Sequence, residues 1–241
     1  MVGSHRGMTR TIAVIQARLG SQRFPAKMLA DLGGHSVLEW VVTRVRRSTL
    51  VDRTVVATTQ ETLDDRLVAE CQRLGVEAKR GSTNDVLGRF VAAIEGDAAD
   101  AVVRVCADNP FIDPACIDQV IREFRESGAE YAFNHRPFGD CNYADGFGAE
   151  VVSRRLLERL DGTTLTAQHR EHVTLAVADG SIEASIHACA APKPLARPEL
   201  RFDVDEPNAL AELEALVRKG HLSLRSSATE VIAAADSRMR T

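Results

Sequence analysis

Thr11-Ile-Ala-Val-Ile-Gln-Ala17 runs directly into Arg18-Leu-Gly-Ser-Gln-Arg-Phe-Pro-Ala-Lys27, and this stretch decides the fold. Its first half is short, apolar and rich in β-branched residues, so it predicts a buried strand over Thr11–Ala17. Its second half is a basic loop that leaves the carboxyl end of that strand. In open α/β sheets, ligands bind at this end of the strands. The stretch therefore predicts an α/β fold with a ligand site directly after its first strand.

Short apolar runs alternate with longer helical patterns as far as residue 126. We expect further strands at 53–58, 77–80 and 101–106, and helices at 36–47, 63–74, 86–94 and 114–126. This alternation predicts a doubly wound, mostly parallel sheet with helices on both faces.

The pattern changes after about residue 131. Helices are expected at 151–160, 168–178, 207–218 and 229–238, and strands at 182–188 and 200–204. We expect residues 1–10 to be a disordered leader and residues 11–241 to form a single domain. Residues 133–198 are expected to form a small inserted lobe of that domain.

Composition narrows the possible functions. The chain has 241 residues, of which 44% are hydrophobic, and a net charge of −4, so it lacks the basic excess of a nucleic-acid-binding protein. No apolar run reaches the ~18 residues that would span a membrane. The five cysteines are odd in number and form no C-x-x-C pair, which argues against a disulfide framework or a structural zinc site and indicates a reducing cytoplasm.

The basic loop suits a polyphosphate. Arg18, Arg23 and Lys27 place three cations within ten residues, and Gly20 and Ser21 let the backbone approach a ligand closely. Arginine grips phosphate oxygens in pairs, and lysine acts as a point charge. The loop matches neither the P-loop nor the G-x-G-x-x-G pattern. The alternative is an ordinary solvated basic loop.

The same loop resembles the R-x-x-S-x-R-x-P-x-K signature of the cytidylyltransferases that activate acidic sugars, which include the CMP-sialic acid and CMP-Kdo synthetases. The chain is most similar to the spore-coat polysaccharide branch of that superfamily. Further matches, in family order, are Val56-Ala-Thr58 with Asp64-Asp65, Arg80-Gly-Ser-Thr-Asn-Asp-Val-Leu87, Arg104-Val-Cys-Ala-Asp-Asn-Pro110 and Arg170-Glu-His-Val173. The resemblance implies a Rossmann-like sheet of the nucleotide-diphospho-sugar transferase (GT-A-like) type. It also implies transfer of CMP from CTP to a small acidic acceptor, with release of pyrophosphate.

The resemblance also implies a nucleotide site. The backbone of Ala17–Leu19 would face the pyrimidine, and the three loop cations would hold the β- and γ-phosphates and stabilise the departing pyrophosphate. The expected nucleotide-binding residues are Ala17, Arg18, Leu19, Gly20, Ser21, Arg23, Lys27, Arg80, Ser82 and Asp85. The expected catalytic residues are Arg18, Lys27 and Asp108.

Three aspartates are candidate ligands for Mg²⁺, which takes one or two carboxylates together with phosphate oxygens. Asp108 follows the strand at 101–106, and Asp203 and Asp205 lie two residues apart, which in a strand places both on one face. Each could instead be a turn or cap residue. Val204-Asp205-Glu-Pro-Asn-Ala-Leu210 resembles the family's V-D-x-P-x-D-L segment, whose first aspartate is a metal ligand; Asn208 departs from it. We expect Asp108 and Asp205 to bind the metal, with Asp203 third.

The acceptor side is less defined. Arg170 could grip an acceptor carboxylate or phosphoryl group, and His172 could accept a proton. Both could equally belong to a helix surface or a dimer interface. Asn134, Asp145 and Glu150 are further acceptor-binding candidates. The sequence does not name the acceptor, which could be a sugar acid or a phosphonate or phosphate compound, and it leaves the preference for CTP over other nucleotides open.

Two other functions fit parts of the pattern. Asp203-Val-Asp205 resembles the metal-binding D-x-D of glycosyltransferases that use nucleotide-sugar donors, although the loop cations favour a triphosphate. An inactive nucleotide-binding module is the non-enzymatic alternative. The resemblance further implies a homodimer, formed through the 133–198 lobe.

Overall fold

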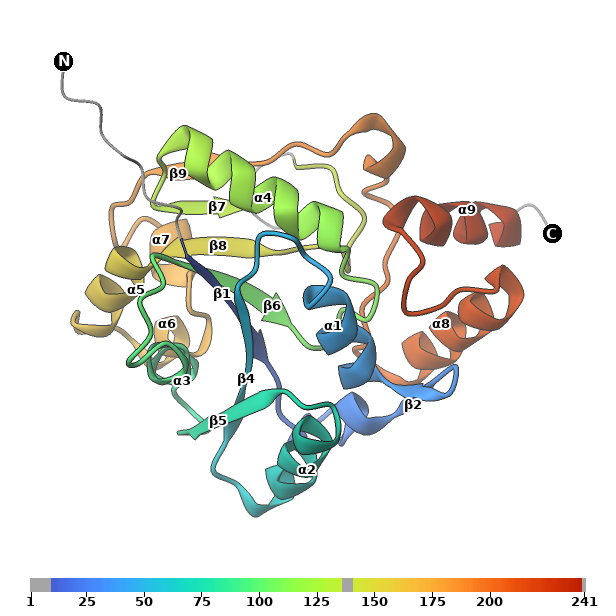
Figure 1. Cartoon of the computed structure of the whole chain (residues 1–241), viewed down its shortest axis with the longest axis horizontal. Coiled ribbons are helices and arrows are strands. Elements are labelled where there is room, and N and C mark those ends of the chain that lie inside the picture. Colours follow the sequence, from blue (N-terminus) through green and yellow to red (C-terminus); the bar gives the residue numbers. More distant parts are fainter. Residues whose placement is uncertain (1–9, 136–140, 240–241) are drawn as a thin grey trace.

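The computed structural model describes residues 10–135 and 141–239. Within them, a seven-stranded sheet has the order β5-β4-β1-β6-β8-β7-β9 (Figure 1). The strands are β1 (Thr11–Gln16), β4 (Arg53–Thr59), β5 (Glu77–Gly81), β6 (Ala101–Cys106), β7 (Tyr131–Phe133), β8 (Glu150–Ser153) and β9 (Ile186–Ala188). β8 pairs antiparallel with β6 and with β7, and the other pairings are parallel. The expected doubly wound, mostly parallel sheet is confirmed.

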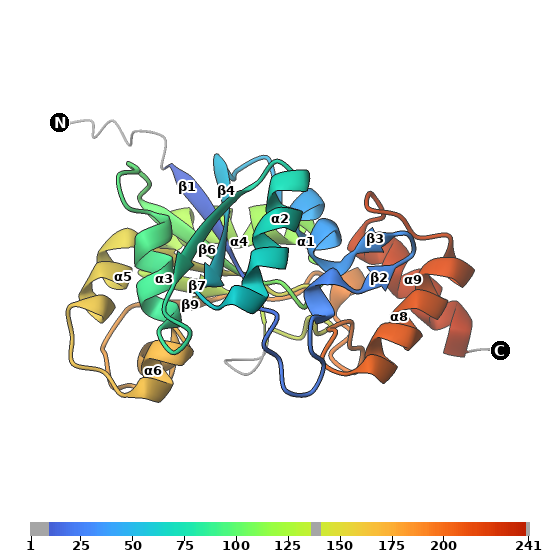
Figure 2. The ribbon, with the colours of Figure 1, turned by 90° about the horizontal axis from the view of Figure 1, so that it is seen from below.

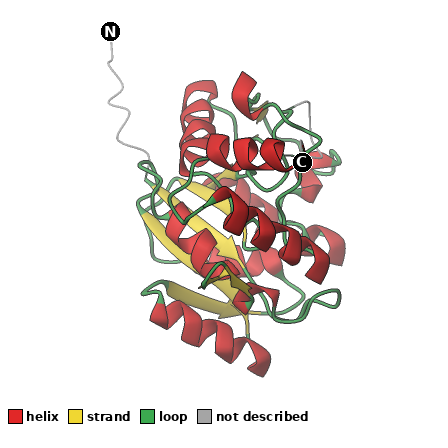
Figure 3. Cartoon of the chain, turned by 90° about the vertical axis from the view of Figure 1, so that its right-hand side faces the viewer, coloured by secondary structure: helices red, strands yellow, loops and turns green. Residues whose placement is uncertain are grey.

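Helices cover both faces of this sheet (Figure 3). Successive residues of β1 divide between two apolar clusters, because side chains of a strand point alternately to its two faces. Ala13 and Ile15 join the cluster that includes α1 (Val37–Val45), α2 (Asp65–Arg73) and α4 (Pro114–Ser127). Ile12 and Val14 join the cluster that includes α3 (Val86–Ala93), α5 (Arg154–Asp161) and α7 (Leu175–Ala178). The central strands are therefore buried on both sides.

The C-terminal helix α8 (Pro207–Gly220) packs beside the small hairpin of β2 (Asp31–Leu32) and β3 (His35–Ser36), and α9 (Ala228–Met239) packs on α8 (Figure 2). None of the helices in residues 10–135 and 141–239 is both long and apolar enough to cross a membrane.

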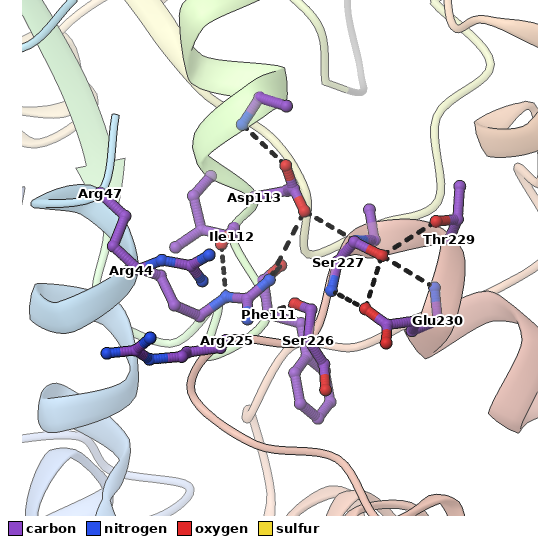
Figure 4. A network of polar contacts seen from close by, with 12 residues as sticks. Arg44, Arg47, Phe111, Ile112, Asp113, Arg225, Ser226, Ser227, Thr229 and Glu230 are labelled. Atoms are coloured by element: carbon purple, nitrogen blue, oxygen red, sulfur yellow. Dashed lines mark hydrogen bonds and ion pairs between the residues drawn. The ribbon is translucent and has the colours of Figure 1, made fainter. Parts of the chain in front are cut away.

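Arg44 of α1 holds the segment before α9 against the loop before α4 (Figure 4). Its fully buried guanidinium donates to the carbonyls of Ile112 and Ser226, each at 2.7 Å, and lies 3.6 Å from Asp113. Burial lowers the pKa of Arg44 to about 10, so the group remains charged. Asp113 in turn accepts from the Ala228 amide at 2.7 Å. One buried charge thus joins α1, the loop before α4 and the start of α9.

Three sequence-based assignments are wrong in detail. The helix expected at 151–160 begins with strand β8, because its first residues pair between β6 and β7. The helix expected at 168–178 divides into α6 (Ala167–Glu171) and α7, since His172 leaves the helical conformation. The strand expected at 200–204 is reduced to a single bridge between Arg201 and Asp145.

The expected lobe at 133–198 contributes β8 and β9 to the main sheet.

The expected leader lies outside the described residues except for residue 10. The single-domain boundaries, and the use of 133–198 for acceptor binding and dimerisation, remain predictions.

Candidate active site

The candidate site lies where β1 and β6 end side by side. β1 pairs with β4 on one edge and with β6 on the other. The connection from β1 leads to β4, whereas the connection from β6 leads to α4 and β7, so the two loops diverge. Such a divergence opens a crevice at the carboxyl ends of the strands. The basic loop and the segment carrying Asp108 both leave this point.

Lys27 meets two of the three candidate metal carboxylates. Its Nζ lies 3.0 Å from Asp108 Oδ2 and 3.2 Å from Asp205 Oδ1, and only 9% of its side chain is exposed. The Val204 amide donates to the Asp108 carbonyl at 2.8 Å, which joins the late segment to the loop after β6. Residues 27, 108 and 205, far apart in the sequence, therefore converge at one place.

The cations set the charge state of Asp205. Burial by itself would raise the pKa of this carboxyl, but Lys27 and Arg23 outweigh burial and lower the pKa below its usual value. The carboxylate is thus ionised near neutral pH, as a metal ligand must be.

Internal hydrogen bonds shape the basic loop. The Ala26 amide donates to the Leu19 carbonyl at 2.9 Å, and Ala26 adopts a left-handed conformation at φ 59°. The Leu19 amide donates to Asp64 Oδ1 at 2.7 Å, while Asp64 Oδ2 accepts from Thr58. The buried Asp64 therefore fixes the start of the loop. The matched segment Asp64-Asp65 was the only sequence signal for this role.

The other two loop cations reach into solvent. Arg23, with 63% of its side chain exposed, lies 3.0 Å from Asp205 Oδ2, and Arg18, 42% exposed, lies 3.5 Å from Glu171 of α6. Next to Arg23 is a cleft of about 320 Å³ lined by Arg23, Arg201, Asp203, Asp205, Glu206, Ala209, Glu212 and Leu213. A larger hollow of about 590 Å³ lies between α8 and α9. We assign the site to the smaller cleft, because it adjoins the strand ends and contains Asp205.

Comparisons with known proteins agree with this geometry. A sequence profile of the cytidylyltransferase family matches residues 12–226. The chain belongs to the cytidylyltransferase family. It is 33% identical over 231 residues to the spore coat polysaccharide biosynthesis protein SpsF of Bacillus subtilis, covering 93% of each chain. It is also 42% identical over 116 residues to the 3-deoxy-manno-octulosonate cytidylyltransferase of Trichlorobacter lovleyi, covering 47% of this chain and 44% of that protein.

A solved cytidylyltransferase from Leptospira borgpetersenii is similar to the whole chain, with a TM-score of 0.87 at 25% identity and 96% coverage of each. The expected family and enzyme class, a nucleotidyltransferase, are confirmed. The glycosyltransferase alternative does not fit this result, and the alternative of an inactive nucleotide-binding module stays open to the turnover test.

The residues that were expected to lie near the base and ribose of the nucleotide form hydrogen bonds with other parts of the protein. Arg80 donates to the carbonyls of Thr59 and Glu61 and to Asp65. Ser82 is exposed, and its carbonyl accepts from Arg89. Asp85 caps α3 by accepting from the Gly88 amide at 2.8 Å. These contacts hold Arg80 against β4 and α2 and Asp85 at the start of α3, and the nucleotide contacts of the segment remain predictions.

Two expected acceptor-binding residues are buried structural groups in the cytidylyltransferase. The Glu150 carboxylate accepts from Tyr131 at 2.8 Å and Thr174 at 2.7 Å, and it pairs with Arg104. Burial would raise the pKa of Glu150, but Arg104 and the other partners outweigh it and hold that pKa at about 2. Asn134, also fully buried, accepts from the Ala149 amide at 2.7 Å. Neither residue lines the cleft beside Asp205.

The remaining acceptor candidates divide between two places. Arg170 of α6 forms a bidentate pair with Asp85, at 2.9 and 2.7 Å, and contacts Asp161 at 2.7 Å; His172, at the end of α6, is exposed. These contacts place α6 against α3. Asp145 instead lies beside Arg201, next to the cleft.

The third metal candidate, Asp203, is held by Arg201 through two contacts of 3.1 and 2.9 Å. It lines the cleft but does not contact Lys27, whereas Asp205 does. Of the two late aspartates, Asp205 therefore has the position that suits a shared cation with Asp108.

Proposed function

We propose that this cytidylyltransferase transfers CMP from CTP to a small acidic acceptor, a sugar acid or a phosphonate or phosphate compound, and releases pyrophosphate. The convergence of Lys27 with Asp108 and Asp205 carries the proposal, since it joins the triphosphate loop to two carboxylates at the sheet's switch point. An acceptor oxygen attacks the α-phosphorus in line. The bond from the α-phosphorus to the oxygen bridging toward the β-phosphorus breaks, and pyrophosphate leaves with that oxygen.

The chain's contribution to this step is positioning and charge neutralisation. Arg18, Arg23 and Lys27 face the β- and γ-phosphates and stabilise the charge that develops on the departing pyrophosphate. Asp64 holds the loop that carries them by accepting from the Leu19 amide. The backbone of residues 17–19 faces the pyrimidine.

Asp108 and Asp205 fit a divalent cation. Their Oδ2 and Oδ1 atoms both lie within 3.2 Å of one ammonium group, so two carboxylate oxygens already converge around a positive charge. Mg²⁺ is the cation that this oxygen set and the triphosphate favour, and when bound it supplies further neutralisation of phosphate charge.

The acceptor is expected in the cleft beside Asp205. Arg201 lines it with 66% of its side chain exposed, so its guanidinium can meet an acidic group. Asp145 and Asp203, which pair with Arg201, orient its guanidinium. An acidic acceptor would bind here by replacing a carboxylate at Arg201, because the cleft also carries Asp203, Asp205, Glu206 and Glu212.

The direct test is a pyrophosphate-release screen of the four nucleoside triphosphates against a panel of sugar acids, phosphonates and phosphate compounds, with and without Mg²⁺. We expect release with CTP, an acidic acceptor and Mg²⁺ together. Release that is equal for all four nucleotides would overturn the assignment of CTP. Release that favours neutral over acidic acceptors would overturn the assignment of the cleft.

A further inference from the structure

A second group of metal-binding side chains lies on the other flank of the sheet. Glu123 of α4, His187 of β9 and Cys189 each place one donor atom within 4.8 Å of the other two. In the part of the chain that the structure describes, no other set of three histidine, cysteine or acidic residues converges in this way. β9 is the edge strand, separated from β6 by β8 and β7, so the group is distinct from Asp108 and Asp205.

The backbone brings these three groups together for simple reasons. His187 and Cys189 are two residues apart along an extended segment, so their side chains point to the same face. α4 packs on that face and supplies Glu123. His187 Nε2 lies 2.8 Å from Glu123 Oε2, and Gln119, one turn earlier in α4, donates to Glu123 Oε1 at 2.8 Å. The carboxylate is therefore oriented with one oxygen toward the other two groups.

We propose that Glu123, His187 and Cys189 bind Zn²⁺, or a cation of similar softness, and that the cation ties edge strand β9 to α4. Zn²⁺ takes sulfur at about 2.3 Å and nitrogen or carboxylate oxygen at about 2.0–2.2 Å, which puts tetrahedral ligands about 3.3–3.7 Å apart. The three donor atoms lie within 4.8 Å of one another, so they must approach by only about 1 Å to reach these ligand–ligand distances. Mg²⁺, which prefers oxygen ligands, does not suit this set.

The exposure of the three side chains leaves a position for a fourth ligand. Cys189 is fully buried, whereas the side chains of His187 and Glu123 are 36% and 28% exposed. A cation held by all three therefore faces solvent on the side of His187 and Glu123, where water completes the tetrahedron. Gln119 supports the site from outside the ligand set, as hydrogen-bonded neighbours of metal ligands commonly do.

Binding requires a defined exchange of protons. Burial raises the pKa of the Cys189 thiol, so the metal-free group is a neutral thiol. A thiolate is the ligand form, and the cation therefore displaces the thiol proton to solvent. His187 binds through an unprotonated Nε2 and carries its hydrogen on Nδ1, exchanging its contact with Glu123 for a bond to the cation.

No short sequence motif predicts this site. The ligands come from residues 123, 187 and 189, and the absence of C-x-x-C spacing pointed away from zinc. Only the packing of α4 over β9 assembles them. The site does not depend on the proposed CMP transfer.

The test is a calorimetric titration with Zn²⁺ of the metal-free protein in excess Mg²⁺, paired with a titration by Co²⁺, whose thiolate complexes give a charge-transfer absorption band. We expect one equivalent of Zn²⁺ to bind, a cobalt–thiolate band, and a melting temperature that rises with Zn²⁺. Cys189→Ala should lose the band, and His187→Ala should weaken Zn²⁺ binding by at least about 10–100-fold, because even outer partners of metal ligands contribute that much.

Two further variants keep the result interpretable. Cys106→Ala removes the thiol near Asp108 and should retain both the band and the Zn²⁺ affinity. Glu123→Gln keeps the side chain's shape, so it tests the site even if a cysteine variant does not fold. The proposal fails if the folded wild-type protein needs millimolar Zn²⁺, if the band is lost in Cys106→Ala, or if Glu123→Gln and His187→Ala bind Zn²⁺ as the wild type does.

Discussion

Replacing Lys27 by methionine tests the proposed site most directly. The ammonium lies 3.0 and 3.2 Å from two carboxylates. At an effective dielectric constant of about 20, each contact represents about 5 kcal/mol of gross attraction, much of which offsets the cost of burying the charge. Methionine keeps most of the unbranched side chain but removes the charged ammonium group. Loss of one such group from a transition state costs about 3–4 kcal/mol, so we expect kcat/KM to fall about 100–1000-fold.

The assay is pyrophosphate release with CTP and the acceptor found in the screen, together with thermal melting to verify folding. Lys79→Met is the matched control, because Lys79 forms an exposed pair with Glu77 on β5 at 3.4 Å. We expect it to retain turnover. We also expect the pKa of Asp205 to rise in Lys27→Met, since Lys27 helps to hold it low. Near-normal turnover of Lys27→Met would refute the catalytic assignment.

Glu150, Asp64 and the divalent cation give three further predictions. Glu150 has a folded-state pKa of about 2, below the ordinary value of about 4.3. The stabilisation that its carboxylate gives is therefore present above pH 4 and is lost as the pH falls toward 2. In Glu150→Gln the melting temperature should fall less steeply with decreasing pH than in the wild type, and an unchanged slope would contradict this. Asp64→Ala should weaken CTP binding about tenfold by calorimetry, through loss of the Leu19 contact. Asp52→Ala removes a similar contact to the Thr11 amide and should leave CTP binding unchanged. An equal loss of CTP affinity in both variants would contradict the role of Asp64 in shaping the loop. Chelation should abolish pyrophosphate release and Mg²⁺ should restore it; turnover that survives chelation would exclude the metal role.

The alternation of strands and helices could be predicted because it follows from local pattern. The meeting of Lys27 with Asp108 could be predicted because each residue follows a strand, and parallel strands place their carboxyl ends at one edge of the sheet. The position of Glu150 could not be predicted in this way. Its sequence neighbourhood is rich in glycine and polar residues, and its burial depends on Arg104, 46 residues away on β6. A long-range pairing of this kind leaves no periodic signal near either residue.

The assignment of Asp203 and Asp205 shows the same limit at closer range. In a regular strand both aspartates would lie on one face. Of the expected strand 200–204, only Arg201 forms a β-bridge, and its guanidinium pairs with Asp203. Asp205 is left to Lys27 and Arg23.

The contacts of the loop cations suggest how the site exchanges charge. Arg18, Arg23 and Lys27 each face a carboxylate of the protein, namely Glu171, Asp205, and Asp108 with Asp205. In the proposed complex, triphosphate oxygens would replace these carboxylates at the three cations. A divalent cation held by Asp108 and Asp205 would compensate the charge of both carboxylates, and the side chains of Lys27 and Arg23 would then be available to the triphosphate. CTP and metal should therefore bind with positive coupling, because each removes a competitor of the other.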